Sequence, residues 1–139
     1  MLIFQWKEYG ANNENDGGAN IPLSLKVRKG VLQLGYQAKL GDHRSPVWTK
    51  EISTNTVYKV GLEILAKKGD GHVRLWWNGK PATFTETHEQ VLTGNLWGKQ
   101  TDPKVGIYGG EEVETDSWVY QVQVGTKKGD VDGKFFGEA

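Results

Sequence analysis

The sequence contains no cysteine, which excludes disulfide bonds, thiolate metal sites and cysteine nucleophiles. It also lacks an excess of either charge: 17 basic side chains balance 17 acidic ones, so we expect neither nucleic acid nor an anionic membrane as a partner. Long apolar runs are missing, so we expect no segment that spans a bilayer. No pair of histidines has the spacing of a zinc site, and the first residues lack the features of a signal peptide.

Two residue types are abundant instead, with 19 glycines and 6 tryptophans among 139 residues. Many glycines between short, regularly spaced apolar strands are typical of an all-β sandwich or barrel. We therefore predict one domain over residues 1–125, an antiparallel, sheet-on-sheet sandwich of the jelly-roll type. Residues 126–139 are predicted to be a polar, loosely held tail. Six tryptophans exceed the need of a core this size, which suggests that some face a ligand.

Alternation of apolar and polar residues with period 2 locates the strands. Lys29-Gly30 is expected at one hairpin turn, and Asn78-Gly79 is the strongest two-residue hairpin signal in the chain. A short helical turn is predicted around residues 86–91. The predicted strands cover residues 2–9, 23–28, 31–36, 47–52, 57–65, 72–77, 104–108 and 118–124.

The strand over residues 104–108 carries an unusual combination of side chains. Alternation directs Val105 and Ile107 into the core and leaves Lys104, Gly106 and Tyr108 on the other face. A cation, a bare stretch of backbone and a phenol together favour a binding groove, because glycine lets a ligand approach the backbone. The alternative is a half-buried strand with a snorkelling lysine and a packed tyrosine.

Four motifs follow one another in the sequence: Phe4-Gln5-Trp6-Lys7, the run from Gly71 to Gly79, Lys104-Val105-Gly106-Ile107-Tyr108, and Trp118-Val119-Tyr120-Gln121-Val122. Their order resembles that in the concanavalin-like jelly-roll polysaccharide lyases. Glucuronan lyases are the nearest likeness, and alginate lyases are more distant. The likeness covers nearly all of residues 1–125, and it implies an extracellular location.

The resemblance implies cleavage of a uronic-acid polysaccharide, such as glucuronan, by β-elimination. In this reaction the carboxylate beside C5 is neutralised, a base removes the C5 proton, and an acid protonates the leaving oxygen at C4. Gln5 would donate its amide to the carboxylate. Tyr108 would be the acid and, in a syn elimination, also the base. Lys104, on the same face, is expected to make this phenol a better base.

Four further residues are predicted to bind the polymer. Lys7 and Arg74 would hold other carboxylates, Trp76 would stack on a sugar ring, and His43 would reach the substrate from its loop. Each has a plainer interpretation. Arg74 suits a cross-strand ion pair with a glutamate, and His43 suits an ordinary surface position. Trp76 and Trp77 point to opposite faces, so one of them belongs to the core.

Other functions fit parts of the sequence. A non-catalytic, lectin-like carbohydrate-binding module would use the same groove without a complete acid and base. A retaining glycosidase needs two closely spaced carboxylates, and residues 111–116 supply acids, although without clean alternation. Residues 12–20 contain the acids and amides of a structural calcium site but not the spacing of an EF-hand; otherwise we expect no cofactor.

The chain departs from the family pattern in two ways. It is shorter and begins at the strand that carries Gln5, so we expect the N-terminal strands of the family to have no counterpart. Tyr108 is followed by Gly109-Gly110, where the family tends to place a polar or basic residue. Missing strands leave exposed sheet edges, which normally demand a partner. The hypothesis that follows is a homodimer that pairs these edges.

Overall fold

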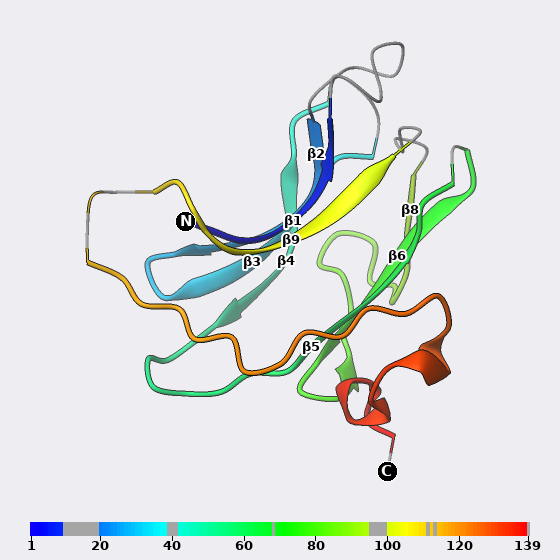
Figure 1. Ribbon diagram of the computed structural model, residues 1–139. Helices are drawn as coiled ribbons and strands as arrows, with labels where there is room; N and C mark the ends of the chain where they lie inside the picture. The colour runs from blue at the N-terminus through cyan, green and yellow to red at the C-terminus, as the bar shows by residue number, and fades with distance from the viewer. Residues whose placement is uncertain are drawn as a thin grey trace.

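The computed structural model describes residues 1–9, 20–38, 42–67, 69–94, 100–110, 112 and 114–138, and its regular structure is almost entirely β (Figure 1). The predicted all-β sandwich is confirmed, because antiparallel strands form two sheets around one apolar core. The jelly-roll connectivity stays a prediction. The strands are β1 (Leu2–Glu8), β2 (Asn20–Arg28), β3 (Val31–Tyr36), β4 (Ser45–Glu51), β5 (Val60–Leu65), β6 (Gly71–Trp77), β7 (Lys80–Pro81), β8 (Leu92–Gly94) and β9 (Thr101–Tyr108).

The larger sheet has five strands in the order β4-β3-β2-β1-β9. β1 therefore lies between its sequence neighbour β2 and the distant β9. The smaller, four-stranded sheet is built on β6, which pairs with β5 on one side and with β7 and β8 on the other. β4, β9 and β5 lie at sheet edges in the described part of the chain, and the homodimer through such edges stays a prediction.

Two predicted hairpin turns have the backbone that their sequences require. Lys29 and Gly30 have φ angles of 49° and 74°, and Asn78 and Gly79 have φ angles of 48° and 79°. Two consecutive positive φ angles are typical of the type I′ turn, whose twist matches that of the two strands it joins. Each turn consequently fixes the register of its hairpin, β2 with β3 and β6 with β7.

Replacing Gly79 by alanine is expected to lower the free energy of unfolding by about 1–2 kcal/mol, because a side chain disfavours the left-handed backbone. A Cβ at this position would also lie 3.1 Å from Gly137 Cα in the C-terminal segment. Gly69 is a matched control, with a φ of 88° and no atom within 4 Å of the added Cβ. Urea denaturation should show a larger loss for Gly79→Ala; equal losses would contradict the contact with Gly137.

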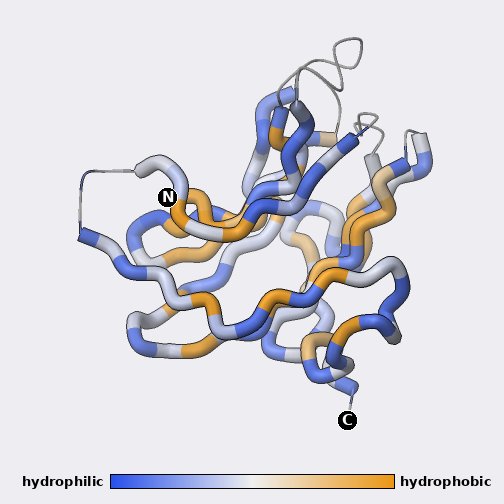
Figure 2. Tube along the Cα trace, in the orientation of Figure 1, coloured by the Kyte–Doolittle hydropathy of each residue, from blue (hydrophilic) through white to orange (hydrophobic). Residues whose placement is uncertain are grey.

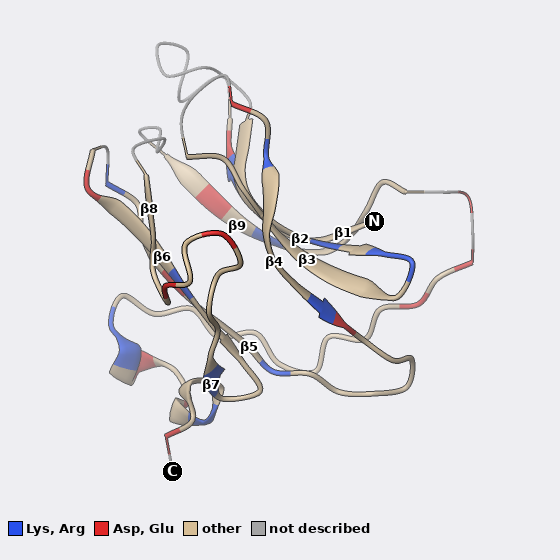
Figure 3. Cartoon of the chain, turned by 180° about the vertical axis from the view of Figure 1, so that it is seen from behind, with Lys and Arg blue, Asp and Glu red and all other residues tan. Residues whose placement is uncertain are grey.

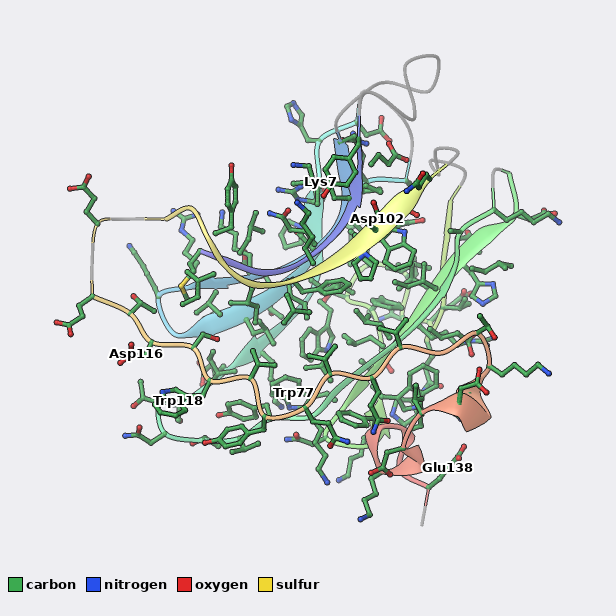
Figure 4. The ribbon with its side chains drawn as sticks, in the orientation of Figure 1. Lys7, Trp77, Asp102, Asp116, Trp118 and Glu138 are labelled. Carbon is green, nitrogen blue, oxygen red and sulfur yellow. The ribbon has the colours of Figure 1, made fainter. Side chains whose placement is uncertain are left out.

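The core lies between the two sheets. Leu23 and Leu34 of the larger sheet and Val73 of the smaller one are completely buried. Apolar residues alternate with polar ones along these strands (Figure 2), so each sheet turns one apolar face to the other. Trp77 packs between Trp48 and Tyr58, with ring centroids 5.4 Å and 4.8 Å away, and Figure 4 shows it in this layer. Trp77 is thus the tryptophan of its pair that joins the interior.

One side of the core is incompletely filled. A cavity of about 720 Å³ lies where β1 and β9 of the larger sheet face β5 of the smaller one. Residues 119–128 line it from outside the sheets, and this segment runs beside β5 (Figure 1). Its apolar lining includes Ile3, Phe4, Val60, Leu62, Val105, Val119, Val122 and Phe135.

Three expectations from alternation are wrong at this side. Val105 and Ile107, predicted to be in the core, are 49% and 45% exposed because β9 is an edge strand beside the cavity. The predicted strand over residues 118–124 is not formed, although apolar and polar residues alternate in its sequence, and all seven residues are exposed. No strand of the described chain pairs with this segment, and an isolated extended segment lacks the ladder hydrogen bonds that define a strand.

The region between β7 and β9 and the C-terminal tail also differ from expectation. The helical turn predicted around residues 86–91 is absent; a turn at residues 85–87 and strand β8 take its place. The tail, predicted to be loosely held, forms the short 3-10 helices η2 (Lys128–Asp130) and η3 (Gly133–Phe136). The Phe136 ring meets Trp76 edge-on at 4.8 Å, which holds the tail against β6.

Candidate functional site

Strands β1 and β9 of the five-stranded sheet are strongly bent, and the concave side of the bend faces away from the smaller sheet (Figure 1). Gln5 pairs in register with Ser24 of β2 and Lys104 of β9, and Ser24 pairs with Gly35 of β3. Residues directly opposite each other share a face, and their neighbours Phe4 and Leu25 face inward. We call the outer surface around Gln5, Lys7, Ser24, Gly35 and Lys104 the concave face.

Gln5 lies at the centre of the concave face. Its side chain is 6% exposed, and its amide nitrogen Nε2 is buried without a hydrogen-bond partner in the described part of the chain. A buried donor without an acceptor costs about 1–3 kcal/mol of folding free energy. Because this nitrogen is buried, a ligand oxygen can accept a hydrogen bond from it only when the side chains that cover it move aside. The donor role of Gln5 therefore stays a prediction.

Two lysines of the concave face converge on one aromatic ring. Lys7 Nζ lies 5.3 Å and Lys104 Nζ 4.9 Å from the centroid of the Tyr9 ring. Both distances are in the range of a cation–π interaction. Figure 4 labels Lys7 on β1 and Asp102 on β9, which are partners in the register of these strands. Lys7 and Lys104, which were predicted to have different roles, therefore meet at one ring, and Lys104 is the cross-strand partner of Gln5.

Arg44 joins the concave face from the segment before β4. Its side chain crosses Gly35, where an added Cβ would lie 3.1 Å from Arg44 Cγ and 3.2 Å from Ser24 Oγ. The guanidinium donates to the carbonyl oxygen of Ile21 at 3.0 Å. Partial burial lowers the pKa of Arg44 from its usual value. The neighbouring His43 is exposed, so its predicted reach toward a substrate rests on its position beside Arg44.

Tyr108 lies at the other end of β9. It pairs in register with Leu2, is 69% exposed and follows Lys104 by four residues. A strand rises about 3.3 Å per residue, so roughly 13 Å of strand separate the two positions. An irregularity in the pairing between Leu2 and Phe4 keeps Tyr108 on the outer face. The sheet thus places Tyr108 on the predicted face but away from Gln5 and Lys104.

Arg74 and Trp76 belong to the other sheet. Both lie on the outer side of β6, while their neighbours Val73 and Leu75 are buried in the core. The Arg74 guanidinium contacts Glu63 Oε1 of β5 at 2.9 Å, which is the cross-strand ion pair given as its alternative interpretation. The same oxygen lies 3.0 Å from His72 Nε2.

Trp76 is covered by the tail and is only 8% exposed. Besides the edge-on contact with Phe136, Lys128 Nζ lies 5.3 Å from its ring centroid. A single groove holding Arg74 and Trp76 with Gln5 and Lys104 is therefore not formed. The prediction failed because alternation gives the face of a strand but not the sheet to which the strand belongs.

Two residues of the concave face were missed by sequence reasoning. Tyr9 continues the alternation of Gln5 and Lys7, and this signal was available. Arg44 reaches the face only because Gly35 lacks a side chain, and no local pattern reveals that contact.

Basic and acidic residues are distributed over both sheets (Figure 3). The described residues contain no group of three or more metal-ligating side chains. Of the predicted calcium loop, only Asn20 is described, and residues 12–19 lie outside the described residues. Glu111 of the predicted carboxylate set also lies outside them.

The concave face thus combines a buried amide donor with three cationic side chains on the outer side of a bent sheet. Such a face is suited to bind an extended anionic ligand. Within the described part of the chain, no helix has the length and apolar character needed to cross a membrane. Comparisons with protein-family models, with curated proteins and with solved structures found no match to this chain.

Proposed function

We propose that the chain binds a uronic-acid polysaccharide on the concave face and cleaves it by β-elimination. The observation that carries the proposal is the buried amide nitrogen of Gln5, which has no hydrogen-bond partner in the described part of the chain; Gln5 lies directly across the ladder from Lys104. A uronate carboxylate accepts hydrogen bonds only, and once the side chains that cover Gln5 move aside, this pair offers it one neutral and one charged donor. Hydrogen bonds that involve an ionised group are about twice as strong as neutral ones.

Elimination needs this charge neutralisation first. With the carboxylate held by Gln5 and Lys104, the C5 proton becomes more acidic, and a base removes it as the C4–O bond breaks. The electron pair of the C5–H bond forms the C4–C5 double bond, and the leaving oxygen takes up a proton. Tyr108 is the phenol that the family resemblance assigns to both proton transfers.

The position of Tyr108 favours a second candidate, a carbohydrate-binding module that does not cleave its ligand. General acid–base catalysis requires the group to lie within hydrogen-bond reach of the proton it moves. Tyr108 is separated from Lys104 by about half of β9, so the two side chains face different units of a bound polymer. A module of this kind would keep the roles of Gln5, Lys7 and Lys104 in binding.

Incubation with glucuronan, alginate and a neutral glucan separates the candidates. A lyase is expected to produce the ultraviolet absorbance of an unsaturated uronate from an acidic polymer, and Tyr108→Phe is expected to abolish it. Binding, measured by affinity electrophoresis, should weaken about tenfold or more in Lys104→Met, since a hydrogen bond to a charged group contributes roughly 1.5–3 kcal/mol.

Lys80→Met is the matched control, because Lys80 is exposed on β7 of the other sheet. It should leave binding unchanged. Binding without an absorbance change identifies the non-catalytic module. If neither acidic polymer is bound, or if the neutral glucan is bound as tightly, the proposed function is wrong.

A further inference from the structure

We propose that Tyr9 is a positioning residue, whose ring holds the ammonium groups of Lys7 and Lys104 over the concave face for one anionic sugar unit. This inference rests on the proposed binding of an acidic polysaccharide. It adds a residue that contributes through the two lysines rather than by moving a proton.

The geometry places cations from two strands on one ring. Lys7 belongs to β1 and Lys104 to β9, and Tyr9 directly follows the end of β1. The ammonium groups lie 5.3 Å and 4.9 Å from the ring centroid, so both are within reach of its negative face. No other aromatic ring of the described chain has two lysines from neighbouring strands of one sheet on it; Lys128 alone contacts Trp76 and Phe136.

An aromatic ring stabilises two lysine ammonium groups that meet at one place. Like charges repel, and a lysine side chain on a flexible stem moves readily into water. The carboxylate nearest to them in register, Asp102, is the cross-strand partner of Lys7, whereas Lys104 is opposite the uncharged Gln5. The ring quadrupole attracts both ammonium groups and offsets part of their repulsion. A ligand carboxylate bound at the concave face would offset the remaining repulsion between the two ammonium groups.

The consequence for binding is pre-organisation. Ligand affinity is reduced when mobile side chains must be ordered on association. With the ring present, the two ammonium groups are already held at one place on the face before a ligand arrives. The ring, not the hydroxyl, carries this effect, so Tyr9→Phe and Tyr9→Leu separate the proposed role from proton transfer.

The expected result is that Tyr9→Leu weakens binding of glucuronan oligosaccharides about five- to tenfold, since two cation–π contacts are lost. Tyr9→Phe should stay within about twofold of the unmodified chain. In a chain that already carries Lys7→Met and Lys104→Met, Tyr9→Leu should have almost no further effect, because interacting residues are not additive. Equal losses in Tyr9→Phe and Tyr9→Leu would instead assign the effect to the hydroxyl and overturn the proposal.

A readout without ligand keeps the test independent of the proposed function. A ring held against the ammonium groups shifts the NMR signals of the neighbouring lysine ε-methylene protons upfield. These shifts should be present for Lys7 and Lys104, persist in Tyr9→Phe and vanish in Tyr9→Leu. If the shifts are present but no polysaccharide binds, the proposed function is wrong while the positioning role of Tyr9 stands. Absence of the shifts in the unmodified chain would reject the positioning role. The role would also be rejected if Tyr9→Leu weakened binding as much in the chain with Lys7→Met and Lys104→Met as in the unmodified chain.

Discussion

Replacing Gln5 by methionine is expected to raise the free energy of unfolding by about 1–3 kcal/mol, because it removes a buried donor that has no acceptor in the described chain. Methionine has a similar length and no hydrogen-bonding demand of this strength, so it fills the same space. The same change should weaken binding of an acidic polysaccharide, because it removes the amide that we propose as a donor to the carboxylate. Opposite effects on stability and binding are the mark of a residue kept for function.

Gln33→Met is the matched control for this variant. Gln33 lies on the same outer face of β3, pairs in register with Lys26 and is only half-buried. Its amide has access to water, so the replacement should leave stability nearly unchanged. Urea denaturation and affinity electrophoresis measure the two effects. A Gln5→Met chain that is less stable than the original, or that binds equally well, would show that Gln5 is a structural residue.

Replacing Phe84 by alanine is expected to cost about 3–5 kcal/mol of unfolding free energy, since truncation of a buried phenylalanine loses apolar contacts and leaves a cavity. Phe84 is 1% exposed, although it belongs to no strand. Its backbone is fixed by hydrogen bonds with Glu89 and His88 on the following turn. Most domains are stable by only about 5–15 kcal/mol, so this variant is expected to be largely unfolded at moderate urea concentrations.

The control for Phe84→Ala is Trp118→Ala, which removes a larger ring. Trp118 is 79% exposed and lies outside both sheets (Figure 4). Its removal should change the unfolding free energy by no more than about 0.5 kcal/mol, as is usual for exposed positions. Thermal unfolding followed by circular dichroism compares the two. If Trp118→Ala lowers the unfolding free energy by clearly more than about 0.5 kcal/mol, residues 118–124 pack in solution as a strand.

Local features of the fold were predictable from the sequence. The hairpin of β2 and β3 follows from alternation and from the Lys29-Gly30 turn, and β3 has the predicted bounds of residues 31–36. Asn78-Gly79 marks the end of β6 equally well. These features depend on interactions between residues that are close in the chain, so a short stretch of sequence is enough to predict them.

Features that depend on distant partners were not predictable. Alternation alone does not show that β6 and β1 belong to different sheets, so Arg74 and Trp76 were placed in a groove with Gln5. Nor does it show that residues 118–124 lack a ladder partner. The burial of Phe84 also depends on a turn rather than on a periodic strand. Of the groove predicted to hold Gln5, Arg74, Lys104 and Tyr108, only Gln5 and Lys104 are direct neighbours, because β1 and β9 pair.

The pairing of β1 with β9 has a kinetic consequence. Gln5 and Lys104 are far apart in the sequence, yet they are neighbours in one ladder. Contacts between residues far apart in sequence form late, because closing a long loop costs chain entropy before the contact stabilises it. The hairpins of β2 with β3 and β5 with β6 are local and can form earlier. The concave face is therefore expected to form late in folding. A nascent chain can form it only after β9 has been synthesised.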